Sequence, residues 1–245
     1  MAKRLIARAE RALAALLARG HFDYWTARPV ASFPGLERLG SDYGGWVVPV
    51  GLLDEASICY CAGVGLDVTF DLALIDRIGC TVHAFDPTPR ARAFAEEVAA
   101  GEPRFRYAPV GLWGEDAQLR FYAPADPAHV SHSILNLQQT ENYFEAPCRS
   151  VASLMAERGH ERIDLLKLDI EGAEYEVLDA LLAQGIRPGL LCVEFDELHH
   201  PVDGGFRRRI RARTGRLRAA GYRLIVADGC NYTLVHDAWR AARAA

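Results

Sequence analysis

Apolar runs and amphipathic stretches alternate along the chain from residue 57 onward. Short apolar runs typical of buried strands lie at 57–63, 80–86, 104–112, 163–169 and 188–196. Apolar residues at helical spacing follow at 67–79, 89–100, 150–159, 173–185 and 206–220. Residues 118–123 predict an added strand, and residues 221–235 predict two strands joined by a tight turn at Asp228 and Gly229.

This order of elements predicts the fold. Five strand–helix units favour a doubly wound, mostly parallel α/β sheet with helices on both faces. With the last two strands, we expect a seven-stranded Rossmann-like sheet that ends in a C-terminal antiparallel hairpin. Gly79 and Gly185 are expected helix ends, and Thr88 before Pro89 is an expected helix start. Such sheets bind ligands outside the carboxyl ends of their strands.

The first 50 residues differ from the rest of the chain. We expect an N-terminal helix and an irregular aromatic- and glycine-rich cover in residues 1–50, and the main domain in residues 51–245. The helix would pack on the domain or join the subunits of a homo-oligomer. Charges at Arg8, Glu10 and Arg11 interrupt any signal-peptide core, and no stretch approaches the roughly 20 apolar residues of a membrane span.

Composition narrows the classes of function. The chain has 245 residues, 50% hydrophobic and 24% charged, with a net charge of −4, which suits one large domain and makes nucleic acid an unfavoured partner. The arginine-rich stretch 207–218 is either the solvated face of a helix, with Ile210, Thr214 and Leu217 inward, or a phosphate-binding surface. The six cysteines form no CxxC pair, so we expect reduced, structural cysteines in a cytoplasmic protein.

Candidate chemistry follows the first two predicted strands. Gly63 and Gly65 allow a tight turn and the close approach of a ligand. Val68 stands where a dinucleotide-binding fingerprint has glycine or alanine, which weakens a nicotinamide interpretation. Asp86 ends the second strand, where a carboxylate can accept hydrogen bonds from both hydroxyls of a ribose.

Acidic residues crowd the end of the fourth strand. Asp169 ends the strand and Glu171 follows it, so both are expected in the binding crevice. Glu174 lies in the first turn of the next helix, near its positive end, and Glu176 is expected in solvent. Together with Glu194 on the fifth strand, Asp169 and Glu171 are expected to form a carboxylate-lined site.

Several segments in order resemble the FkbM family of SAM-dependent methyltransferases. They are SDYGGWVVP, CYCAGVGLDVTFD, GCTVHAFDPTP, PVGLWGED with LRFY, SHSIL, IDLLKLDIEGAEYEVL, LLCVEFD, and GYRL with NYTLV. The most specific of them is KLDIEGAE, and the resemblance covers about residues 41–235. The terminal antiparallel hairpin also agrees with the class I methyltransferase fold that the resemblance implies.

The resemblance implies an S-adenosylmethionine (SAM) site. Gly63 and Gly65 would line the methionine end, Asp86 would hold the ribose, and the loop after the third strand would cover the adenine. The family usually has an acid where this chain has Cys61 and often a glycine where it has Asp67. The candidate cofactor-binding residues are Cys61, Gly63, Gly65, Asp67, Asp86, Pro87, Val110, Gly111, Leu112 and Asp169.

Candidates for proton transfer are carboxylates and histidines near the strand ends, with Lys167 as a counter-charge to Asp169. Clustering can raise the pKa of one carboxylate and make it a general base. The same groups are alternative ligands for Mg²⁺ or Mn²⁺, through Asp169, Glu194 and His199 or His200. The candidate catalytic residues are Asp169, Glu171, Glu194, His199 and His132.

The resemblance favours O-methylation of a small-molecule hydroxyl on a sugar or a secondary metabolite. Three alternatives stay open: an RNA methyltransferase that uses residues 207–218, a nucleotide-sugar or NAD enzyme, and a non-catalytic relic that binds SAM or nothing. The aromatic residues before the core either wall the acceptor pocket or pack in the core. They are Tyr24, Trp25, Tyr43 and Trp46.

Overall fold

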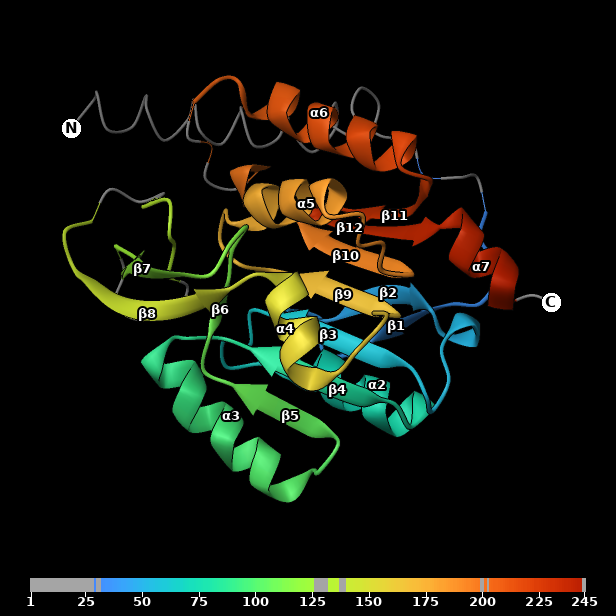
Figure 1. The fold of residues 1–245 in the computed structure, drawn as a ribbon, viewed down its shortest axis with the longest axis horizontal. Coiled ribbons are helices and arrows are strands. Elements are labelled where there is room, and N and C mark those ends of the chain that lie inside the picture. The colour runs from blue at the N-terminus through green and yellow to red at the C-terminus, as the bar shows by residue number, and fades with distance from the viewer. Residues whose placement is uncertain are drawn as a thin grey trace.

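A mixed sheet forms the centre of the protein in a computed structural model that describes residues 29, 32–125, 132–136, 140–198, 201 and 203–243 (Figure 1). In these residues the sheet has seven strands in the order β5-β4-β3-β9-β10-β12-β11. Their bounds are β3 Ile58–Ala62, β4 Thr81–Phe85, β5 Phe105–Ala108, β9 Leu165–Leu168, β10 Leu190–Glu194, β11 Tyr222–Asp228 and β12 Asn231–His236. Strand β12 runs antiparallel to β10 and β11, and the other neighbours are parallel. The predicted fold is confirmed.

Helices cover both faces of this sheet because its central strands are apolar on both sides. Successive residues of β3 divide between the two cores. Tyr60 and Ala62 pack with α4, α5 and α6, whereas Cys59 and Cys61 pack with α2 and α3. The helices are α2 Thr69–Ile78, α3 Pro89–Gly101, α4 Val151–Arg158, α5 Glu174–Ala183, α6 Phe206–Ala219 and α7 Asp237–Arg243 (Figure 1).

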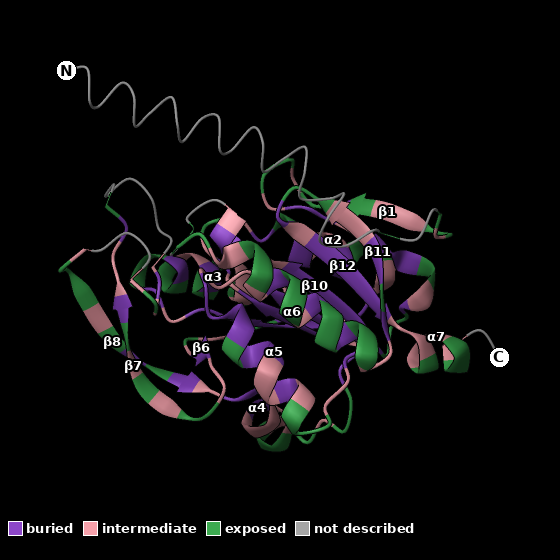
Figure 2. Ribbon diagram, turned by 90° about the horizontal axis from the view of Figure 1, so that it is seen from above, coloured by how far each residue is buried: buried purple, intermediate pink, exposed green. Residues whose placement is uncertain are grey.

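Two small sheets flank the central one in the described residues. A hairpin of β1 (Leu36–Leu39) and β2 (Trp46–Pro49) is tied to β12, because the Thr233 hydroxyl donates to the Val47 carbonyl at 2.8 Å. A three-stranded sheet is built from β6 (Gly111–Leu112), β8 (Tyr143–Arg149) and β7 (Ala117–Tyr122). Figure 2 shows β7 and β8 at one side of the molecule, away from the buried central strands. Both sheets contribute walls to the cavity described below.

Some local expectations were wrong. Residues 104–112 do not form one strand, because Pro109 interrupts them and β5 and β6 belong to different sheets. The cover segment before residue 50 is not wholly irregular, since it contains the β1–β2 hairpin. Strand β8 and helix α7 have no counterpart in the sequence prediction. Strand β8 lacks a continuous apolar run, so its pairing with β6 and β7 identifies it.

Other local expectations are confirmed. Gly79 ends α2 with a left-handed φ of 81°, and Thr88 precedes α3 with Pro89 in its first turn. The added strand and the terminal hairpin appear as β7 and as β11 with β12. Helix α6 buries Ile210, Thr214 and Leu217, as the helical spacing of its apolar residues predicted. All six cysteines are buried.

The prediction of an N-terminal helix falls on residues 1–28, which lie outside the described residues. The oligomer and the division at residue 50 therefore stay predictions. Among the helices of the described residues, none combines the length and the apolar character that a membrane crossing requires.

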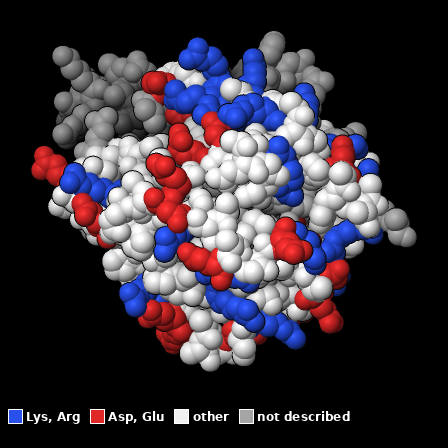
Figure 3. All heavy atoms as spheres, viewed as in Figure 1, with Lys and Arg blue, Asp and Glu red and all other residues white. Residues whose placement is uncertain are grey.

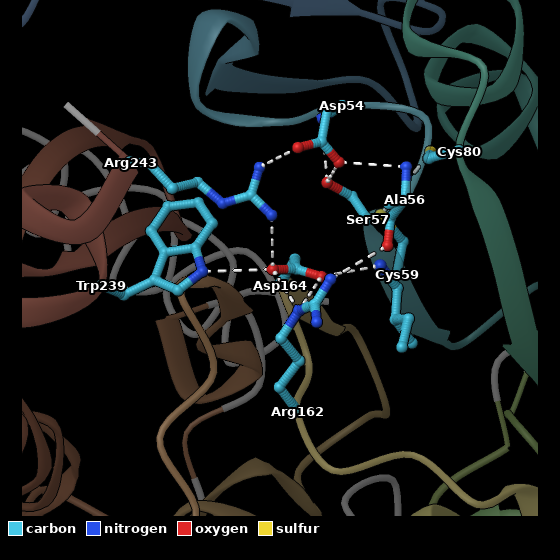
Figure 4. A network of polar contacts seen from close by, with 10 residues as sticks. Asp54, Ala56, Ser57, Cys59, Cys80, Arg162, Asp164, Trp239 and Arg243 are labelled. Atoms are coloured by element: carbon cyan, nitrogen blue, oxygen red, sulfur yellow. Dashed lines mark hydrogen bonds and ion pairs between the residues drawn. The ribbon is translucent and has the colours of Figure 1, made fainter. Parts of the chain in front are cut away.

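A buried carboxylate fixes the end of the sheet opposite the strands' carboxyl ends (Figure 4). The side chain of Asp164, just before β9, has no solvent exposure. It accepts hydrogen bonds from the Ile58 amide at 2.9 Å, the Trp239 indole at 3.2 Å and the Arg243 guanidinium at 3.0 Å, and it pairs with Arg162 at 3.3 Å. Asp164 thus joins β9, β3 and α7.

We expect Asp164→Asn to lower the free energy of unfolding by about 2–4 kcal/mol. Removing one partner of a buried ion pair costs about 3–5 kcal/mol, and the partly exposed arginines reduce that cost here. Urea denaturation measures the change. The matched control is Asp54→Asn. This variant also removes a carboxylate that pairs with Arg243, but the Asp54 side chain is 56% exposed. Equal losses in the two variants would contradict a special role for the buried carboxylate.

Candidate functional site

A cavity of about 760 Å³ opens at the carboxyl ends of the parallel strands. Its volume lies within the range of about 300–1,000 Å³ that small-molecule sites occupy. Its lining comes from the ends of β3, β4, β9 and β10, from the segment between β1 and β2, and from the small β6-β8-β7 sheet. The sequence pattern predicted a crevice at this edge of the sheet, and the cavity lies there.

A glycine turn forms one side of the cavity floor. Gly63 and Gly65 follow β3 with φ angles of 84° and 54°, which favour glycine. A Cβ atom on Gly63 would lie 1.7 Å from the carbonyl oxygen of Asp169, so the turn also requires glycine for space. The Lys167 ammonium donates to the Gly63 carbonyl at 2.8 Å and pairs with the Asp169 carboxylate at 3.1 Å. The turn and the end of β9 are therefore packed as one unit.

Asp86 anchors the glycine turn from the end of β4. One oxygen of its carboxylate accepts hydrogen bonds from the amides of Val64 and Gly65, at 2.9 and 3.0 Å. The other oxygen accepts the Thr88 amide at 2.8 Å. The residue is 6% exposed and lines the cavity. The carboxylate of Asp86, which the resemblance predicts to hold the ribose, thus also organises the backbone around it.

The other cofactor candidates divide into two groups. Asp67, Pro87, Gly111 and Leu112 line the cavity together with Gly63, Gly65, Asp86 and Asp169. Cys61 and Val110 are not among the lining residues. Cys61 is 2% exposed and belongs to the core on the α2 side, because alternate residues of β3 point to opposite faces.

The predicted carboxylates come together at the cavity. Asp169, Glu171 and Glu194 all line it. Burial raises the pKa of Glu194 to about 9, and the nearby Asp169 carboxylate adds to this rise. The Cys230 thiol donates to Glu194 at 2.9 Å. Glu171 has a left-handed φ of 55°, and its carbonyl accepts the Ser133 hydroxyl at 2.7 Å.

Two buried acids beneath this group were not predicted as site residues. Asp196 lines the cavity and accepts the Gly172 amide at 3.0 Å. Glu174 accepts the Ile170 amide at 2.8 Å, and its burial raises its pKa to about 7. Burial also raises the pKa of Asp196 well above its ordinary value. These carboxyls support the loop after β9. Asp196 follows the strand 190–194, so the strand-end reasoning that identified Asp169 would also have found it.

Aromatic and apolar side chains wall the acidic end. Trp46 is buried and lines the cavity beside Tyr43, which is 87% exposed. Phe121, His132 and Ile134 line it from β7 and the segment that follows β7. His132 thus reaches the site, whereas His199 and His200 lie outside the described residues, as do Tyr24 and Trp25.

Metal ligation stays a prediction. Within the described residues, no group of three or more histidine, cysteine, aspartate or glutamate side chains is arranged to hold a metal ion. The predicted set includes His199, whose surroundings the structure does not describe. Two of the carboxylates at the cavity have protein partners in the structure: Asp169 pairs with Lys167, and Glu194 accepts the Cys230 thiol.

We expect Gly63→Ala to destabilise the protein by about 2–4 kcal/mol. A left-handed conformation costs a non-glycine residue roughly 1–2 kcal/mol, and the clash with Asp169 adds to that. The control is Gly51→Ala, where a Cβ atom meets nothing within 4 Å. Urea denaturation of both variants checks the difference. A Gly63→Ala protein as stable as the control would show that the glycine turn can move away from Asp169.

The raised pKa of Glu194 predicts how stability depends on pH. A glutamate in an unfolded chain titrates near pKa 4.3, so between about pH 5 and pH 9 the folded state keeps a proton that the unfolded state has lost. Stability should therefore fall as the pH rises through this range. Glu194→Gln cannot ionise, so we expect its melting temperature to exceed that of wild type by a margin that grows as the pH rises from about 5 to about 9.

Thermal unfolding at several pH values measures this effect. The exposed Glu176 provides a control, since Glu176→Gln should follow the wild-type curve at every pH. A constant offset between Glu194→Gln and wild type would contradict the raised pKa.

Curated proteins similar to this chain include methyltransferase-like proteins. Probable methyltransferase-like protein 24 of Homo sapiens is 30% identical over 147 residues, which cover 58% of this chain and 33% of that protein. The Rattus norvegicus protein of the same name is 28% identical over 145 residues with the same coverage. The chain thus spans about a third of the length of these curated relatives.

Solved structures with a similar fold are more distant in sequence. A putative caffeoyl-CoA O-methyltransferase from Staphylococcus aureus has a TM-score of 0.42 at 8% identity, covering 73% of this chain and 74% of that one. Fibrillarin of Aeropyrum pernix, solved with natively bound S-adenosyl-L-methionine, has a TM-score of 0.41 at 10% identity, covering 84% of each chain. In sequence, residues 59–224 match the methyltransferase FkbM domain, which is more than half of the chain. The chain therefore belongs to the FkbM family of methyltransferases.

Proposed function

We propose that this chain binds SAM in the cavity and transfers its methyl group to a hydroxyl of a small molecule. The observation that carries the proposal is the juxtaposition of the glycine turn, Asp86 and the acidic strand ends around one cavity. Family membership supports the reaction class. The type of acceptor, a sugar or a secondary metabolite, follows from the resemblance described above.

The residues present fit SAM by their chemistry. Gly63 and Gly65 line the cavity without side chains, so a ligand can approach the backbone of the turn closely. Asp86 accepts three backbone amides, and a carboxylate has about four acceptor positions, so it retains capacity for a ribose hydroxyl. Asp169, Glu171 and Glu194 supply negative charge for the cationic end. Cys61 and Val110 would act on the cofactor only through their neighbours.

SAM supplies a methyl group that its positively charged sulfur already activates. The protein must then hold the acceptor hydroxyl in line and remove its proton, and good alignment in such reactions is worth roughly 7–11 kcal/mol. Trp46 and Phe121 would exclude water from the acceptor end. Glu194, with its pKa raised to about 9, is a strong base once it has lost its proton. Asp169, Glu171 and His132 are the other candidates among the described residues, and His199 is a candidate outside them.

The geometry of α6 favours a small molecule over RNA. Figure 3 shows basic side chains gathered at the top of the molecule, where α6 lies in Figure 1. Several of these arginines have protein partners. Arg209 pairs with Glu197 and Asp203, and Arg213 and Arg216 pair with Asp179. These pairings neutralise part of the positive charge of α6, which carries seven arginines. Strongly salt-dependent RNA binding would instead favour the RNA alternative.

We expect the protein to bind SAM and S-adenosylhomocysteine with micromolar affinity, and Asp86→Ala to weaken binding by more than about tenfold, or about 1.4 kcal/mol. The variant loses the ribose acceptor and the anchor of the Val64 and Gly65 amides. Calorimetric titration with and without Mg²⁺ measures both effects and tests the metal alternative.

Asp76→Ala is the control for this titration, because Asp76 is exposed on α2 and is not among the residues that line the cavity. It should bind like wild type. Absence of SAM binding by the wild-type protein, with and without Mg²⁺, would reject the proposed function and favour the non-catalytic alternative. Quenching of NADH fluorescence in its place would favour the nicotinamide alternative.

A further inference from the structure

Three polar side chains are buried beneath the cavity floor, on the face of the sheet that packs against α2. The side chain of Lys167 on β9 is 5% exposed. Cys61 on β3 is its direct neighbour across the strand pair, since the two residues are in register. Asp71 in the first turn of α2 is 3% exposed. Of the three, only Lys167 lines the cavity.

Lys167 connects two parts of the site. Its ammonium donates to the Gly63 carbonyl at 2.8 Å and pairs with Asp169 at 3.1 Å. The position and charge of this one group therefore affect both the glycine turn and the strand-end carboxylate. A buried ammonium is costly unless nearby negative charge compensates it.

Asp169 by itself is an incomplete counter-charge. Its side chain is 29% exposed and faces the cavity, where water and ligands compete for it. Asp71 provides a second carboxylate from the protein interior. Burial by itself would lower the pKa of Lys167, but Asp169 and Asp71 together raise it above its ordinary value. Asp71 therefore helps to keep the ammonium charged.

Asp71 is not explained by its local hydrogen bonds. Its Oδ1 atom is buried and has no hydrogen-bond partner among the described residues. Burial raises the pKa of this carboxyl, and the Lys167 ammonium opposes the rise first, followed by the Cys61 thiol. The largest favourable influence on this buried carboxylate is the Lys167 ammonium, and Asp71 lies in the helix that covers the Lys167 face of β9.

We propose that Asp71 is a positioning residue of the cofactor site, which acts through Lys167 to hold the Gly63 turn and Asp169 in place. The inference rests on the proposed SAM site for its functional consequence, but its structural consequence can be measured without any ligand. Position 61 is the other place from which a carboxylate would reach Lys167, because it is the register partner on β3. Moving the carboxylate from position 71 to position 61 should therefore preserve its effect on Lys167.

The test compares wild type with Asp71→Asn, the double variant Cys61→Asp with Asp71→Asn, and the control Asp76→Asn. The control removes a charge from the same helix at an exposed site. Hydrogen exchange of the 63–65 amides is followed in the ligand-free proteins. These amides are held by the Phe85 carbonyl and by Asp86. Calorimetry then measures the dissociation constant for SAM.

We expect Asp71→Asn to exchange these amides at least tenfold faster than wild type and to bind SAM at least tenfold more weakly. The double variant should return both values to within about threefold of wild type, and the control should leave both unchanged. A merely structural role for Asp71 would not be rescued by an acid at position 61. If Asp71→Asn does not fold, a double variant that folds and has wild-type exchange supports the proposal.

Two results would overturn the proposal. One is wild-type exchange of the 63–65 amides in a folded Asp71→Asn protein. The other is a double variant that is impaired as much as Asp71→Asn. If wild type does not bind SAM but the exchange pattern appears as expected, the positioning role stands and the proposed function is wrong.

Discussion

The contacts of Lys167 organise the edge of the sheet at which the cavity opens. Its ammonium is buried, and it joins the carbonyl of the glycine turn after β3 to the carboxylate at the end of β9. The absence of a side chain at Gly63 allows these two strand ends to approach each other. Asp86 then holds the next two amides of the turn from β4. Three neighbouring strands thus deliver their ends to one cavity through a few polar contacts.

Buried acids have different surroundings at the two ends of the sheet. At the amino end of β9, Asp164 is surrounded by donors from Arg162, Arg243 and Trp239, so its charge is compensated and serves stability. At the carboxyl ends, acids outnumber the cations near them, and burial raises the pKa values of Glu174 and Glu194 to about 7 and about 9. Such crowding lowers stability at neutral pH. A cationic ligand, such as the one in the proposed function, would relieve this crowding of acids.

The elements around the sheet form the walls of the cavity, whereas the strand ends form its floor. The β1–β2 hairpin and the β6-β8-β7 sheet supply Trp46 and Phe121 to its walls, while the strand ends supply charge. Under the proposed function, the strand ends would hold the cofactor and the walls would contact the acceptor. The cofactor part could be reasoned from motifs, whereas the acceptor part depends on how distant segments assemble.

The sequence by itself determined the order of strands and helices, the glycine turn, and the placement of Asp86, Asp169 and Glu194 at strand ends, because these follow from local periodicity and short motifs. Only the tertiary structure decided that Cys61 faces away from the cavity. Alternate residues of a strand point to opposite faces of the sheet, so a shift of one residue would have changed the face on which Cys61 lies. Tertiary pairing also decided the existence of β8, whose sequence has no continuous apolar run. The burial of Asp71, Glu174 and Asp196 likewise depends on which elements pack over them, and no local pattern of polar residues encodes that packing.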